Sequence, residues 1–220
     1  MYNIIKAFVF CSILFVLSGC MNNEPMPQLS YEAPEKIVPP RVLPPTRPSV
    51  KGDEGGYADW APPSYLENKA RWQGIIIHHS GTPYGNAAHE DQYHKSIGWD
   101  GLGYDFVINN GVYQKGYGNP DGLVEVGYRW HNQETGSHCR INGDASNYWN
   151  EHTIGICLIG NFNEGRPTER QMQSLAELVR FLQSRYHIST SQIKGHSDVK
   201  PTDCPGKYFP MSRLKSMLRG

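Results

Sequence analysis

Short apolar runs alternate with helical patterns along the chain from residue 67 to its C-terminus. The apolar runs predict strands at residues 71–79, 103–108, 153–159 and 192–194. The sequence Asn109-Asn110-Gly111 is typical of a tight hairpin turn, and it predicts that the second strand pairs with residues 112–114. These patterns place the start of the folded part near residue 67.

Helical spacing marks three further segments, at residues 87–96, from Thr168 onward and at residues 211–218. Thr168 to Gln171 forms a capping-box pattern, with Thr at the N-cap and Gln three residues later. Apolar side chains then recur on one face and indicate a core-facing helix rather than a cofactor site: Met172, Leu175, Leu178, Val179 and Leu182. Strands that alternate with helices, together with one hairpin, predict an α/β fold with a mixed central β-sheet flanked by helices.

The first 20 residues have the pattern of an export signal. Lys6 gives a positive start, and residues 7–17 form an apolar run that is too short to span a bilayer as a mature helix. The run ends in Leu17-Ser18-Gly19-Cys20, which resembles the lipobox of bacterial lipoproteins. That resemblance implies cleavage before Cys20 and diacylation of its sulfur. The alternative is an uncleaved anchor, or a cysteine that stands there by chance.

Residues 21–66 hold ten of the 16 prolines and few large aliphatic side chains, so they cannot build a core of their own. We interpret them as an extended linker between a lipid anchor and a domain at residues 67–220, although filler sequence would give the same geometry. Met21 follows Cys20, where many bacteria with two membranes use Asp to retain lipoproteins at the inner membrane. The expected location is the cell envelope, on the outer membrane facing the periplasm if there are two membranes.

Composition narrows the classes of function. The 21 Lys and Arg balance 21 Asp and Glu, and this zero net charge argues against a nucleic-acid-binding protein. Five cysteines are too few for a disulfide scaffold in a chain of 220 residues. All nine histidines follow residue 77, so the candidate chemistry lies in the folded part.

Histidines and one cysteine gather at the ends of predicted strands. His78 and His79 end the first strand, and because neighbouring side chains on a strand point to opposite faces, at most one of them can join a single metal site. His196 ends the last strand and Cys204 follows it. Two imidazoles and a thiolate suit a tetrahedral zinc with an open fourth position. From residue types alone, core or surface histidines are the alternative, and His94 is expected to pack on its helix.

Four segments resemble, in this order, the type 2 N-acetylmuramoyl-L-alanine amidases, a family that includes the peptidoglycan recognition proteins: residues 75–80, 99–108, 153–162 and 195–206. The resemblance spans about residues 71–210. It implies one Zn²⁺ held by His78, His196 and Cys204. It also implies hydrolysis of the amide bond between N-acetylmuramic acid and the L-alanine of peptidoglycan, in cell-wall turnover.

The same resemblance leaves a second function open. Family members that lack the third ligand tend to bind peptidoglycan without cutting it, so the alternative is a non-catalytic peptidoglycan-binding lipoprotein. The retained Cys204 favours the enzyme. A zinc peptidase of the H-E-x-x-H type is a further alternative, but the chain lacks that motif. The expected partners are peptidoglycan and, through the lipid, a membrane; the expected state is a monomer.

The resemblance also assigns roles near the metal. Tyr104 matches the family's active-site tyrosine, whereas its residue type alone would make it a core aromatic beside Phe106. Thr202 matches a position that holds Lys in some members, with a turn hydroxyl beside Pro201 as the alternative. Cys157 stands where some amidases carry an acidic base, which shifts weight to Tyr104 and leaves the general base open.

Further residues are assigned to substrate contacts or to packing. His138 matches a cleft-lining histidine that meets the substrate, with a surface-loop histidine as the alternative. Lys115 and Tyr117, which follow the predicted hairpin, are weaker candidates. His79 is expected to support the site or to pack. A disulfide between Cys139 and Cys157 is one option in an oxidising envelope, and simple burial of Cys157 is the other.

Overall fold

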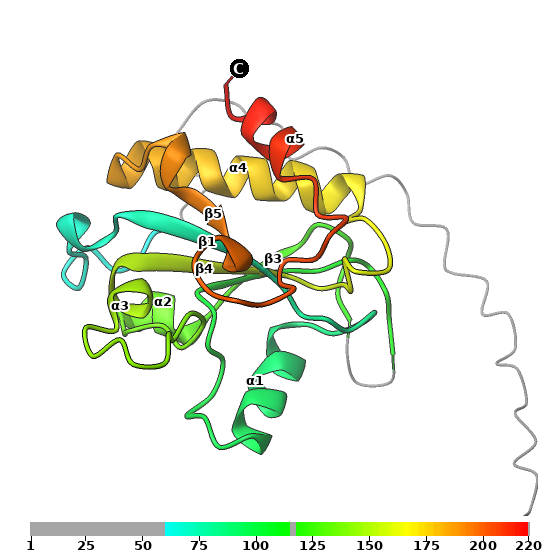
Figure 1. Cartoon of the computed structure of the whole chain (residues 1–220), viewed down its shortest axis with the longest axis horizontal. Coiled ribbons are helices and arrows are strands. Elements are labelled where there is room, and N and C mark those ends of the chain that lie inside the picture. The colour runs from blue at the N-terminus through cyan, green and yellow to red at the C-terminus, as the bar shows by residue number, and fades with distance from the viewer. Residues whose placement is uncertain (1–59, 115–117, 220) are drawn as a thin grey trace, which may run out of the picture. The chain divides into compact units, whose positions relative to one another are not determined.

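The structure is a computed structural model that describes residues 60–114 and 118–219 (Figure 1). The expected signal peptide with Cys20, the linker up to residue 59, and the candidates Lys115 and Tyr117 lie outside the described residues. Within these described ranges, no helix has the length and apolar character needed to cross a membrane.

A five-stranded mixed sheet forms the centre of the described part, as the sequence predicted. The strands lie in the order β3-β2-β4-β1-β5, and only β3 runs antiparallel to its neighbour. Their bounds are β1 Gly74–His79, β2 Phe106–Ile108, β3 Val124–Val126, β4 Thr153–Leu158 and β5 Ile193–Gly195. The carboxyl ends of the four parallel strands meet at one edge of the sheet, where side chains from distant segments come together.

Helices cover both faces of this sheet. Figure 1 shows α4 and α5 on one side and α1, α2 and α3 on the other. The α-helices are α1 Ala87–Ser96, α2 Tyr128–Asn132, α3 Tyr148–His152, α4 Glu169–Tyr186 and α5 Met211–Met217, and the short 3₁₀-helices are η2 Lys69–Arg71, η3 Thr190–Gln192 and η4 His196–Asp198. The expected helices at 87–96, after Thr168 and at 211–218 are confirmed, whereas α2 and α3 were not predicted.

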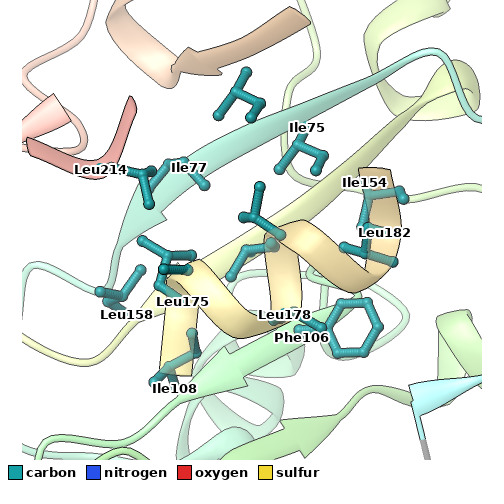
Figure 2. Close-up of a cluster of buried hydrophobic side chains, with 14 of the residues drawn as sticks. Ile75, Ile77, Phe106, Ile108, Ile154, Leu158, Leu175, Leu178, Leu182 and Leu214 are labelled. Carbon is teal, nitrogen blue, oxygen red and sulfur yellow. The ribbon is translucent and has the colours of Figure 1, made fainter. Parts of the chain in front are cut away.

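The long helix α4 provides the main core contact. Thr168 Oγ1 accepts a hydrogen bond from Gln171 N at 3.0 Å, and the Gln171 side chain accepts one from Thr168 N, so the predicted capping box is formed. The apolar stripe of α4 is fully buried against the sheet, and Figure 2 shows Leu175, Leu178 and Leu182 facing strand side chains. This packing makes the α4 face of the sheet largely apolar, so we look for the candidate site on the other face.

Alternation along β1 then decides which histidine faces away from this core. Ile75 and Ile77 pack toward α4, so Ile76 and His78 point to the opposite face. Cys157 lies beside His78 in the register of β1 and β4 and belongs to a small apolar cluster on that same opposite face. The alternation along β1 therefore places the side chain of His78 on the face of the sheet that α1 covers.

The predicted hairpin strand at residues 112–114 is wrong. Strand β2 pairs instead with β3, and Asn109 closes the pairing because its N–H donates to Leu123 O at 3.0 Å. Asn110 Oδ1 accepts from Val112 N at 3.0 Å and turns the chain away from β2. Val112 and Tyr113 are exposed, whereas the valines of β3 pack against the core, so burial favours the more distant strand.

The folded part includes residues that the sequence analysis gave to the linker. Trp130 Nε1 donates to Trp60 O at 2.8 Å, and the ring of Trp60 contacts Phe181 edge-on with centroids 5.9 Å apart. Glu67 accepts two hydrogen bonds from Arg185, at 2.6 and 2.8 Å. Trp60 thus packs on the domain that the sequence placed at 67–220, whereas Tyr65 and Leu66 stay exposed.

Candidate metal centre

His78, His196 and Cys204 converge at the carboxyl edge of the sheet. Each offers one ligand atom, and these atoms all lie within 4.8 Å of one another. Cys204 Sγ lies 3.6 Å from His78 Nδ1, and the rings of His78 and His196 have centroids 4.5 Å apart. His78, which precedes the other two residues by more than a hundred positions, therefore forms one compact donor cluster with them.

Strand pairing explains this convergence. The parallel strands β1 and β5 are neighbours and pair Ile77 with Gly195, so the next residues, His78 in β1 and His196 directly after β5, lie at the same level. The following loop returns Cys204 to this point, because Ser197 N donates to Cys204 O at 2.8 Å. His79 N also donates to Cys204 Sγ at 3.4 Å, which anchors the sulfur beside β1.

The donors suit a zinc ion. Nε2 of His196 is buried and has no hydrogen-bond partner among the residues that the structure describes, so one of the three residues of the cluster carries an unsatisfied buried nitrogen. Burial, helped by Lys200, lowers the pKa of His196 to about 4, and burial lowers the pKa of His78 well below its ordinary value. Both rings are therefore neutral at pH 7, as metal ligands must be. Two imidazoles and a sulfur match zinc rather than a hard cation.

Cys204 carries its proton in this arrangement. Burial raises the pKa of the Cys204 thiol to about 12, with nearby Cys139 adding to the effect. A bound cation reverses this preference because it deprotonates a coordinating thiol outright. The cluster is thus ready to exchange one proton for a metal ion.

Tyr104 lies against the first histidine of the cluster. Its ring centroid is 5.2 Å from that of His78, and its hydroxyl makes a side-chain hydrogen bond with Cys157. Burial raises the pKa of Tyr104 well above its ordinary value, so the hydroxyl keeps its proton. The strand predicted at 103–108 starts only at Phe106, and Tyr104 precedes it, separated from it by a bend at Asp105. A Cβ at Gly103 would lie 2.7 Å from Ser137 O, so this close approach requires glycine beside the tyrosine.

Two other candidates, Thr202 and His138, lie in positions that differ from the roles that the resemblance assigned to them. Thr202 is exposed, and its Oγ1 accepts a hydrogen bond from Cys204 N at 3.3 Å, which is the geometry of the turn hydroxyl named as its alternative. His138 was expected in the lining of the cleft. The structure instead places its ring, 5% exposed, behind His78, with His138 Nδ1 at 3.0 Å from His78 Nε2. The reason is space: Gly155 on β4 has no side chain to fill the position that the ring occupies.

His79 and His94 have packing roles. His79 points to the other face of β1 from His78, and its Nδ1 accepts from Phe162 N at 3.0 Å. His94 is buried under Trp99, with ring centroids 4.5 Å apart, and its Nδ1 accepts from Gly103 N at 3.2 Å. Both positions agree with the sequence expectation.

The disulfide that was one option for Cys139 and Cys157 is not formed. Both are buried free thiols, as the second option held for Cys157. Cys157 lies on β4 under Tyr104, while Cys139 lies in the loop after His138, where burial raises its pKa to about 11. The two thiols do not bond to each other, and the thiol of Cys157 instead accepts the hydrogen bond of the Tyr104 hydroxyl.

Two buried carboxyl groups near the site were missed. Asp105 is 0% exposed; its Oδ2 accepts from Gly155 N at 2.7 Å, its Oδ1 has no partner among the described residues, and burial raises its pKa to about 7. Glu90 on α1 is 3% exposed, and its charge contributes to the raised pKa of both Tyr104 and Cys157. The spacing Ala87-Glu90-His94 on one helix face was the available signal for Glu90.

Two neutral imidazoles and a thiol thus lie together at the carboxyl edge of a mixed sheet, with a protonated tyrosine against them, and this arrangement defines a candidate metal centre with three protein ligands. Comparison with known proteins identifies the family. Residues 68–207 match the N-acetylmuramoyl-L-alanine amidase family, and the chain belongs to that family.

Relatives and solved structures agree with this assignment. The chain is 32% identical over 164 residues to the endolysin of Enterobacteria phage T3, covering 69% of this chain and 95% of the endolysin. It is 27% identical over 170 residues to peptidoglycan-recognition protein SC1a of Drosophila melanogaster, covering 66% and 82%. The solved endolysin N-acetylmuramoyl-L-alanine amidase LysCS from Clostridium intestinale has a TM-score of 0.56 at 34% identity, covering 69% of this chain and 86% of that one.

Proposed function

We propose that this protein is a zinc-dependent amidase that hydrolyses the bond between N-acetylmuramic acid and the L-alanine of the peptidoglycan stem, in cell-wall turnover. The observation that carries the proposal is the complete donor set, His78, His196 and Cys204, beside the protonated hydroxyl of Tyr104. Membership of the amidase family and the similarity to phage endolysins support it. Similarity to recognition proteins makes binding without hydrolysis the competing function.

His78, His196 and Cys204 would hold the ion through nitrogen and sulfur donors. When bound, zinc supplies Lewis acidity and an activated water near neutral pH. Tyr104 lies against His78 with its proton in place: its raised pKa keeps the hydroxyl neutral, so it donates a hydrogen bond to the carbonyl oxygen as charge develops there. The same hydroxyl can pass a proton to the leaving amine of L-alanine. Thr202 would offer a weaker, uncharged donor at the mouth of the site.

The proposal also includes a cellular location, the cell envelope, where a lipid anchor would hold the protein. Lipidation of Cys20 would hold the enzyme in a bilayer, and the proline-rich residues that follow would separate the domain from it. If the cell has two membranes, Met21 favours the outer membrane. A tether of this kind raises the local concentration of enzyme at the wall and prevents its escape.

Digestion of purified peptidoglycan tests the activity. The zinc-loaded protein should release stem peptides that begin with L-alanine, identified by mass spectrometry. The variant His196→Ala should release none, while the exposed-histidine control His131→Ala should equal the wild type. Cosedimentation with peptidoglycan and no released peptide would replace this proposal by the binding-only function.

A further inference from the structure

A chain of hydrogen bonds runs from the metal cluster into the sheet. His78 Nε2 lies 3.0 Å from His138 Nδ1, and His138 Nε2 lies 3.2 Å from Thr153 O. A carbonyl oxygen only accepts hydrogen bonds, so the proton of His138 must sit on Nε2. This single fact fixes the direction of every bond in the chain.

His138 must then be an acceptor toward His78. The ring is buried against that of His78, with ring centroids 5.1 Å apart, and a second proton would place a desolvated charge between the two rings, so the ring is neutral. A neutral ring protonated on Nε2 has a lone pair on Nδ1. His78 therefore donates from Nε2, and its own lone pair lies on Nδ1, the atom that is 3.6 Å from Cys204 Sγ.

The surroundings are shaped for this second histidine. A Cβ on Gly155 would lie 2.6 Å from the His138 ring, and one on Gly136 would lie 2.7 Å from it, so two glycines make room for the imidazole. Asn150 Oδ1 accepts from His138 N at 3.0 Å and fixes the backbone that carries the ring. A ring held on its faces and at both nitrogens cannot turn to face substrate without breaking these contacts.

We propose that His138 is a positioning residue for zinc: it holds His78 in the Nε2-protonated form and thereby directs the lone pair of Nδ1 toward Cys204 and His196. The inference rests on the proposed zinc site and gives His138 a role different from the substrate contact that the sequence suggested. Histidine ligands commonly need such an outer partner, whose loss weakens metal binding by about 10- to 100-fold.

Two substitutions separate the acceptor from the volume of the ring. In His138→Leu the acceptor disappears while most of the volume remains; in His138→Asn the amide oxygen stands near the former Nδ1 and can still accept from His78. We expect the zinc Kd of the full chain, measured by competition with a chromophoric chelator, to rise about 10- to 100-fold for His138→Leu and to return most of the way for His138→Asn.

The matched control is His94→Leu. His94 is also a buried histidine whose Nδ1 accepts a backbone hydrogen bond, but it does not touch a ligand. Its zinc Kd should equal that of the wild type. Two results would overturn the proposal. If His138→Leu and the wild type have the same zinc Kd, His138 does not affect zinc binding. If His138→Leu and His138→Asn raise the zinc Kd equally, the effect comes from packing and not from the hydrogen-bond acceptor.

A spectroscopic measurement keeps the inference testable if the variants do not fold. Long-range ¹H–¹⁵N correlation of the imidazoles in the wild-type chain should show protonated Nε2 on both His78 and His138, and His138→Asn should keep the His78 pattern. Protonated Nδ1 on either ring would refute the proposed relay. If the wild type binds no zinc at all, the proposed function fails; if it binds zinc with the other tautomers, only the role of His138 fails.

Discussion

Replacing Tyr104 by Phe removes one oxygen and tests the proposed chemistry most directly. The ring stays in place against His78, so folding and zinc content should be retained. The hydrogen bond that is lost goes to a thiol, a weak partner, and its contribution to the free energy of unfolding should be about 1 kcal/mol or less. The rate should fall much more, by about 10²-fold or more, since the hydroxyl is the proposed oxyanion donor or proton donor.

A 100-fold loss corresponds to about 2.7 kcal/mol of transition-state stabilisation, more than the expected change in stability. The assay is release of stem peptide from purified peptidoglycan, with zinc content and thermal unfolding measured on the same samples. Tyr65→Phe, on an 85% exposed ring, is the control for a lost hydroxyl. Because the pKa of Tyr104 lies well above 10, the defect should be the same at pH 7 and pH 9. Wild-type turnover by Tyr104→Phe would make Tyr104 a packing residue.

Three further predictions concern the proposed metal centre, the buried carboxyl group and the lipid anchor. His196→Ala should lose stoichiometric zinc by metal analysis, and undiminished zinc would exclude His196 as a ligand. Asp105 has a pKa raised to about 7, so its ionisation favours the unfolded chain and wild-type stability is lost as pH rises from about 4 to 7. Asp105→Asn should therefore gain stability over the wild type across that range, by at most about 4 kcal/mol in urea unfolding of the zinc-free protein; a pH-independent difference would contradict this. Cys20→Ala should move the protein from the membrane to the soluble fraction, and a wild type that is wholly soluble would end the lipoprotein hypothesis.

Elements with strong local patterns could be predicted from the sequence. The capping box gives the start of α4 within a residue and the apolar stripe gives its buried face, because capping and burial there act in the same direction. The hairpin failed because a local Asn-Gly turn signal cannot show that Val112 and Tyr113 have no core to cover. The short helix α2 was missed because its buried residues, such as Arg129, are held by long-range hydrogen bonds, here to Leu102 O.

The convergence of His78, His196 and Cys204 could be predicted because parallel strands place their ends together, and His78 could be chosen over His79 only by family resemblance. The relay through His138 could not be predicted, since the sequence does not show which side chain lies behind β1 at a distance of sixty residues. Glu90 was overlooked for a similar reason: an acidic residue on a helix is normally solvated, and only the packing of α1 shows that it is buried.

Gly155 lies in β4, and its lack of a side chain makes room for the His138 ring that contacts His78. Glycine weakens a strand interior, so its presence in the middle of β4 calls for a close approach by another group. Two groups make that approach: Gly155 N donates to Asp105 Oδ2, and the ring of His138 occupies the space where a side chain would begin. Any larger residue would push His138 away from His78, so the proposed relay makes the zinc site depend on a residue that has no ligand atom to offer.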